Sequence, residues 1–87
     1  MNESLHTIIK KLRTRKHNTR FRDAEKLLLN LNFAERNSKH GTSHRVFSHP
    51  ELNCNITLVT HGRNDVLPSY QVQDIIKALQ ELEELQQ

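Results

Sequence analysis

Four histidines fall close together in the middle of this 87-residue chain, at positions 40, 44, 49 and 61. Two kinds of chemistry use such a group. A neutral imidazole binds metal ions, and an imidazole that changes charge near neutral pH can move a proton during a reaction. The spacing of the four residues, and the residue types around them, decide between these two chemistries.

The spacing argues against a metal site. Successive side chains of a strand point to opposite faces, so His44 and His49 cannot converge on one ion. The one cysteine, Cys54, belongs to no CxxC pair, and no HExxH motif occurs. We therefore expect no metal ligands and no cofactor. Cys54 has no disulfide partner within the chain, and we interpret it as a small apolar strand residue.

Charge is distributed unevenly along the chain. Residues 1–50 carry 11 lysines and arginines against 4 acids, whereas residues 51–87 carry 2 against 6. A basic surface attracts phosphates by releasing their counterions, so the first half is expected to face a polyanion such as a nucleic acid. The competing interpretation is an ordinary solvated face of a basic protein.

The period-two pattern gives the orientation of His44. In its predicted strand, 43–49, only one of the apolar residues Val46 and Phe47 can point into the core, and Phe47 is the larger. At about 25 cal/mol per Å² of buried apolar surface, burying Phe47 stabilises the fold more. This places Phe47 in the core and His44 on the opposite, open face. A bulge at residues 41–42 would reverse the assignment.

An exposed imidazole among cations can take the proton from an RNA 2′-hydroxyl while that oxygen attacks the adjacent phosphate. Lys39 and Arg45, with the backbone amides of Gly41 and Thr42, are expected to hold the phosphate and its developing charge. The alternative for Arg45, which shares the strand face of Phe47, is that it points to the edge of the core and only its charged end reaches solvent. His61, at the end of the next predicted strand, is expected to support the imidazole or to contact RNA. The alternative for the imidazole is an ordinary exposed strand histidine.

Three helices and three strands are expected to position these residues. Apolar residues at helical spacing predict helices over about 3–13 and 22–31, and a third helix that Pro68 and Ser69 open. Asn32 is expected to take the left-handed conformation that ends the second helix. Strands are predicted near 33–37, 43–49 and 54–61. This order predicts a single α+β domain, with a three-stranded antiparallel sheet covered by helices on one face only.

Four segments, LLLNLNF at 27–33, GTSHRVFSHP at 41–50, ITLVTH at 56–61 and LPSYQV at 67–72, together resemble the HicA toxin family. The resemblance implies a fold similar to a double-stranded-RNA-binding domain over residues 20–82, with residues 1–17 as an accessory helix. It also implies a ribonuclease toxin that cleaves mRNA and a HicB antitoxin that covers its active face. The Gly-Ser-His motif of the family maps onto Ser43 and His44, with His44 as the single catalytic histidine. Arg45 stands where a second histidine is frequent.

Two other functions stay open at the level of sequence. One is a non-catalytic RNA-binding module. The other is DNA binding through the first two helices, although the polar stretch at 14–20 is longer than the turn of a helix-turn-helix. No apolar run of about 18 residues and no signal-peptide pattern occurs, so a cytoplasmic protein without a membrane partner is expected.

Overall fold

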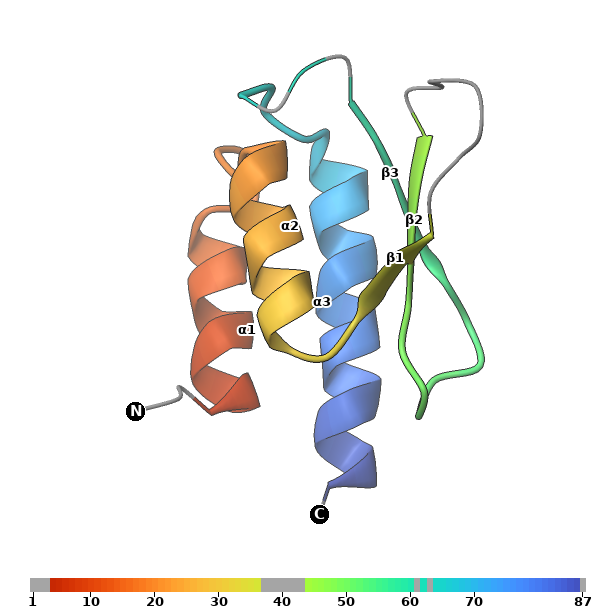
Figure 1. Cartoon of the computed structure of the whole chain (residues 1–87). Coiled ribbons are helices and arrows are strands. Elements are labelled where there is room, and N and C mark those ends of the chain that lie inside the picture. Colours follow the sequence, from red (N-terminus) through yellow and green to blue (C-terminus); the bar gives the residue numbers. More distant parts are fainter. Residues whose placement is uncertain (1–3, 37–43, 61, 63, 87) are drawn as a thin grey trace.

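Helices lie on one side of a small sheet, whose other side they leave uncovered (Figure 1). The computed structural model describes residues 4–36, 44–60, 62 and 64–86. Within these ranges the helices are α1 (Leu5–Thr14), α2 (Phe21–Asn30) and α3 (Ser69–Leu85), and the strands are β1 (Ala34–Arg36), β2 (His44–Ser48) and β3 (Ile56–Val59). The sheet is antiparallel in the order β1-β2-β3. The predicted α+β class is confirmed.

A side-chain cap starts α1, and a left-handed residue ends α2. The Ser4 hydroxyl accepts the Thr7 N–H at 3.2 Å, which satisfies one of the free donors at the start of the helix. At the end of α2, Asn32 has a φ of 76°, as predicted. The Phe33 N–H then donates to the carbonyl of Leu28 at 3.0 Å, and the Asn32 N–H to that of Leu29 at 3.2 Å. This Schellman arrangement turns the chain directly into the sheet.

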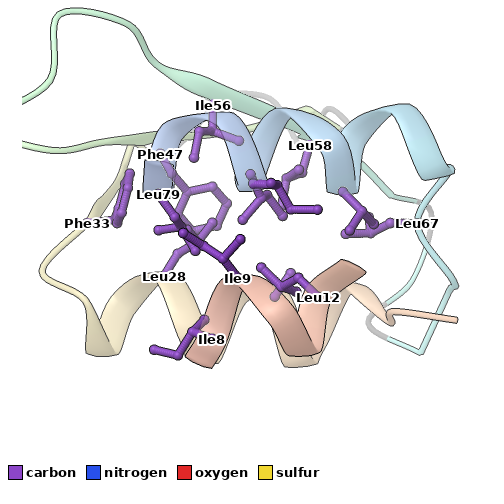
Figure 2. Packing of buried hydrophobic residues seen from close by; sticks show 14 of the residues in the cluster. Ile8, Ile9, Leu12, Leu28, Phe33, Phe47, Ile56, Leu58, Leu67 and Leu79 are labelled. Atoms are coloured by element: carbon purple, nitrogen blue, oxygen red, sulfur yellow. The ribbon is translucent and has the colours of Figure 1, made fainter. Parts of the chain in front are cut away.

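One hydrophobic core joins the sheet to all three helices (Figure 2). Phe47 from β2 and Leu58 from β3 are fully buried, which confirms the predicted orientation of Phe47. The apolar stripe of α3 meets these side chains. Its buried members are Val72, Ile75, Ile76, Leu79 and Leu82. The sheet therefore presents one apolar face to the helices and turns its other side chains outward.

Helix α1 is part of this core. Ile8, Ile9 and Leu12 are buried, and α1 packs along α3. The connection between α1 and α2 is also tied to the segment between β3 and α3. The Leu67 N–H donates to the Thr19 carbonyl at 2.7 Å, and the Phe21 N–H donates to the Asp65 carbonyl at 2.8 Å. The helix predicted to be accessory thus supplies both apolar contacts and a fixed connection to the rest of the fold.

Within the described residues the strands are shorter than predicted. β1 begins at Ala34 and β2 ends at Ser48, whereas β3 runs from Ile56 to Val59, after a turn in which the Leu52 N–H donates to the His49 carbonyl at 3.1 Å. The predicted strand positions 37, 43 and 61 lie outside the described residues. Cys54 lies in this connection, outside any strand, and is exposed. Its interpretation as a strand residue was wrong, because the chain between Pro50 and Asn55 turns before the pairing with β2 resumes.

Candidate functional site

His44 is the first residue of β2 and is exposed on the uncovered face of the sheet. Two observations place it there. Phe47, an odd number of residues along the same strand, points into the core. The register also pairs His44 with Val59, and side chains directly opposite in an antiparallel pair share one face. The imidazole therefore stands at one end of a solvent-facing sheet surface, as predicted.

The same register identifies a cation that the sequence analysis missed. Arg36 lies opposite Val46, which in turn lies opposite Thr57, so these three side chains form one row across the open face. Val46 is two residues from His44 and shares its face. Arg36 is exposed, and no ion pair joins it to another residue in the described ranges. Its guanidinium is therefore available to an anion that lies on this face.

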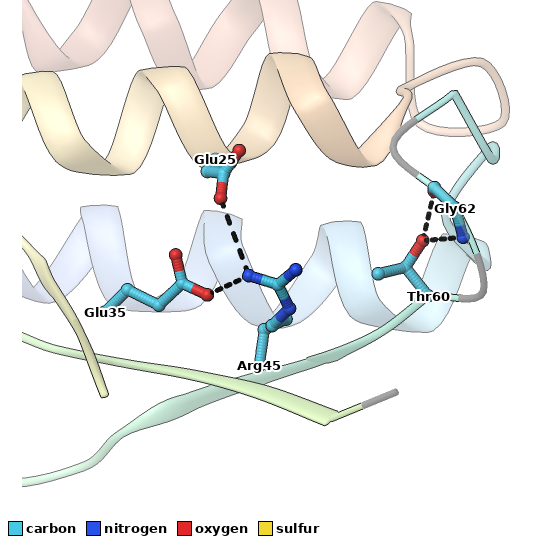
Figure 3. A network of polar contacts seen from close by, with 5 residues as sticks. All are labelled: Glu25, Glu35, Arg45, Thr60 and Gly62. Carbon is cyan, nitrogen blue, oxygen red and sulfur yellow. Dashed lines mark hydrogen bonds and ion pairs between the residues drawn. The ribbon is translucent and has the colours of Figure 1, made fainter. Parts of the chain in front are cut away.

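Arg45 points the other way, between the sheet and the helices (Figure 3). Its Nη1 atom donates to Glu35 Oε2 at 2.5 Å and lies 3.9 Å from Glu25 Oε2. The guanidinium carbon is 5.6 Å from the centre of the Phe21 ring. The hydrogen bond to Glu35, followed by the negative charges of Glu35 and Glu25, raises the pKa of Arg45. A charged side chain held in this way is a structural cation.

The structure does not bring Arg45 to His44, so it does not support the predicted role of Arg45 as a phosphate ligand beside the imidazole. The physical reason is the alternation of the strand. Arg45 is two residues from Phe47 and therefore shares the face that the helices cover. Among the described residues, Arg36 is instead the cation that lies on the same face as His44.

Substitution distinguishes these two arginines. Arg45→Met should lower the free energy of unfolding by about 1–2 kcal/mol, because it removes the cation from which the largely buried Glu35 carboxylate accepts a hydrogen bond, while keeping an apolar stem. Arg36→Ala should change stability by less than about 0.5 kcal/mol. For the predicted binding of RNA, the slope of log affinity against log salt concentration should become shallower by about 0.7. This value corresponds to the loss of one phosphate contact on a single strand.

Urea denaturation and filter binding at several salt concentrations measure these effects. The assignment would be contradicted if Arg45→Met left stability unchanged and removed the salt dependence instead.

The other predicted phosphate-binding residues lie outside the described residues. They are Lys39, Gly41, Thr42, Ser43 and His61, and His40 of the histidine cluster lies outside with them. Their roles stay predictions. Beside His61, the Thr60 hydroxyl donates to the Gly62 carbonyl and accepts the Gly62 N–H, as Figure 3 shows. This pair of bonds fixes the backbone on both sides of position 61.

His49 has a structural role. It is 7% exposed, and its ring meets Phe33 edge-on with 4.8 Å between the ring centres. Its Nδ1 atom accepts the Glu51 N–H at 3.1 Å, which stabilises the turn after β2. In the part of the chain that the structure describes, no three His, Cys, Asp or Glu side chains come together as a set of metal ligands.

Among the described helices, none combines the length and the apolar character needed to span a bilayer. Comparison of the chain with protein-family models, with characterised proteins and with solved structures found no match. The chemistry of the site must therefore be argued from its own residues. It offers one imidazole able to move a proton and one guanidinium able to hold an anion, on the same open face.

Proposed function

We propose that this chain is an endoribonuclease toxin of the HicA type, which cleaves mRNA without a metal ion and uses His44 as its catalytic residue. One observation carries the proposal. His44 is exposed at the start of β2 on the uncovered face of the sheet, and Arg36, which forms no ion pair with another described residue, lies on that face with it. The basic first half of the chain, which contains both residues, supports RNA as the polyanion.

The reaction that fits these groups is an attack within the RNA strand. Neutral His44 takes the proton of a ribose 2′-hydroxyl, and the 2′-oxygen forms a bond to the adjacent phosphorus. The bond from phosphorus to the 5′-oxygen of the next nucleotide breaks, that oxygen takes a proton from a water molecule, and the His44 imidazolium returns its proton to the solvent. The products are a 2′,3′-cyclic phosphate and a 5′-hydroxyl. Arg36 holds the phosphate and offsets its developing charge.

A HicB-type antitoxin is the partner that this proposal requires. None of the described helices covers the sheet face on which His44 lies, so under this proposal inhibition comes from a second protein that covers that face. The arrangement of β1-β2-β3 with α2 and α3 on one face supports a double-stranded-RNA-binding-domain-like core, and the cytoplasm is the compartment in which mRNA is available.

Cleavage should survive chelation. The purified chain should cut a 5′-labelled mRNA fragment at an unchanged rate in about 5 mM EDTA, because proton transfer by an imidazole needs no metal ion. Gel analysis of the fragments, with and without mild acid, which opens a cyclic phosphate to a monoester and so changes the mobility of the fragment, measures both the rate and the chemistry of the ends. Loss of cutting in EDTA, restored by a divalent cation, would contradict the proposal and return the histidines to consideration as ligands.

A non-catalytic RNA-binding module is the second candidate. One observation favours it: among the described residues of the open face, His44 is the only histidine, so these residues supply no second imidazole. In that case purified protein would retard RNA in a gel without cutting it, and His44→Ala would bind equally well.

A further inference from the structure

We propose that a hollow at the outer edge of β3 binds one unpaired base of the RNA whose backbone lies at His44, and that Tyr70 supplies the ring on which this base stacks. The inference rests on the proposed function, and it narrows the substrate to single-stranded RNA. Tyr70 takes no part in the reaction proposed at His44.

The hollow has the size and character of a ligand site. It has a volume of about 360 Å³ and lies between the end of β3 and the segment that leads into α3. Its walls are formed by Val59 and Thr60 on one side and by the segment 65–71 on the other, with Asp65, Val66, Pro68, Tyr70 and Gln71. The Asp65 carboxylate disfavours a phosphate in the hollow, which leaves the base as the part of a nucleotide that it accepts. Small-molecule sites typically measure about 300–1,000 Å³ and combine apolar walls with a few polar groups. One planar base fits this description.

Exposed apolar surface is concentrated here. In the described residues, four large apolar side chains are strongly exposed, and two of them, Tyr70 at 64% and Val66 at 45%, line this hollow. An exposed aromatic ring beside an exposed branched side chain retains apolar area that burial against a ligand would remove from water. A nucleobase offers a flat face for that purpose, and every base can stack on such a ring.

The Tyr70 ring is held in place by its neighbour. Gln71 is 1% exposed, and its Nε2 atom donates to the Tyr70 hydroxyl at 3.3 Å. The Oε1 atom of the same amide accepts the Val59 N–H at 3.1 Å. One buried amide thus ties the tyrosine to the edge of the sheet. A ring that is already oriented loses less conformational freedom when a ligand binds.

Val59 connects the hollow to the proposed reaction site. Because its N–H donates to Gln71, it does not donate to β2, and Val59 and His44 form a non-hydrogen-bonded pair. In such pairs the two Cα atoms are about 4.5 Å apart, and the side chains are neighbours. A strand of RNA with its phosphate at His44 therefore needs only to pass Val59 to bring a neighbouring base to Tyr70. A base in a duplex is stacked and paired, so this site requires a single strand.

Tyr70 can be observed directly, because it is the only tyrosine and the chain has no tryptophan. The probes are 2′-O-methyl RNA octamers of uridine and of adenosine, which cannot be cleaved because the attacking oxygen is blocked. Added to the full chain, at least one of them should quench the tyrosine fluorescence, after correction with free N-acetyltyrosinamide. Tyr70→Ala should weaken binding of that octamer roughly 5- to 150-fold, the range measured for losing one stacked base. Tyr70→Phe, which keeps the ring, should bind within about threefold of the wild type.

Two controls separate stacking from a general loss of structure. Leu29→Ala removes another exposed apolar side chain, on α2, and should leave the affinity unchanged. Val66→Ser alters the same hollow without touching Tyr70 and should weaken binding in the same direction. An abasic nucleotide placed at each position of the octamer in turn should weaken wild-type binding at one position. In Tyr70→Ala, an abasic nucleotide at that position should not weaken binding further, as expected when the ring and the base interact.

The outcomes distinguish this inference from the proposed function. If the chain cuts RNA but Tyr70→Ala leaves the affinity and KM unchanged, the proposed base-binding site is wrong, while the proposed nuclease activity is supported. If fluorescence is quenched and the abasic scan identifies one position, but no cleavage occurs, the base site stands and the nuclease is wrong. Equal affinity of wild type and Tyr70→Ala for both octamers, with no quenching, overturns the inference.

Discussion

Replacing His44 by alanine is expected to lower the rate of RNA cleavage by the purified chain about 10²- to 10⁴-fold, the usual contribution of one general acid–base group. Growth arrest caused by expressing the chain without its partner should disappear. The fold should persist, because His44 is exposed at the start of β2, on the face of the sheet opposite to Phe47. Cleavage is measured on labelled RNA, and growth after induction.

His17→Ala is the matched control, because this exposed histidine lies in the connection between α1 and α2. It should cleave RNA and stop growth like the wild type. Circular dichroism and urea denaturation should give the same curves for both variants. Equal toxicity of His44→Ala and wild type, at equal protein levels, would remove His44 from the mechanism.

Phe47→Ala should lower the free energy of unfolding by about 3–5 kcal/mol, the range for removing a fully buried aromatic side chain. Phe47 is completely buried where the sheet meets the helices. The total stability expected of a chain of this length is roughly 4–13 kcal/mol, so a large share of it would be lost. Urea denaturation followed by circular dichroism measures the change.

Val46→Ala tests whether the loss of stability depends on the face of the sheet that a side chain occupies, rather than on its position in β2. Val46 precedes Phe47 in β2, but its side chain lies on the open face and is only partly buried. Its truncation should cost less than about 1.5 kcal/mol. Equal losses of stability from both substitutions would mean that the helices do not cover one face alone, and the position of His44 would have to be revised with it.

The faces of the sheet were predictable because one large apolar residue decided them. Phe47 and Val46 compete for the core, the difference in their size favours Phe47, and alternation then exposes His44. The end of α2 was predictable for a similar reason, since Asn is the residue, after Gly, that best tolerates the left-handed conformation found at Asn32. In both cases local chemistry determines local geometry.

The cations of the site were harder to predict. Alternation already placed Arg45 on the face of Phe47, but its partners Glu25 and Glu35 come from α2 and β1 and meet it only in the folded protein. Arg36 could be assigned to the open face only after the register paired it with Val46. Tyr70 carried no signal at all, because its exposure depends on where α3 begins relative to the edge of β3.

The packing of α1 along α3 also means that the core closes late in the synthesis of the chain. The two helices lie far apart in the sequence, with α2 and the whole sheet between them, yet they close one core. A nascent chain that has left the ribosome only as far as β3 lacks the helix against which Phe47 and Leu58 are buried. Its strands therefore have no stable partner, and the sheet face that carries His44 cannot form until α3 has emerged. Under the proposed function, the chain can neither cleave RNA nor offer an antitoxin a sheet face to cover before α3 is released.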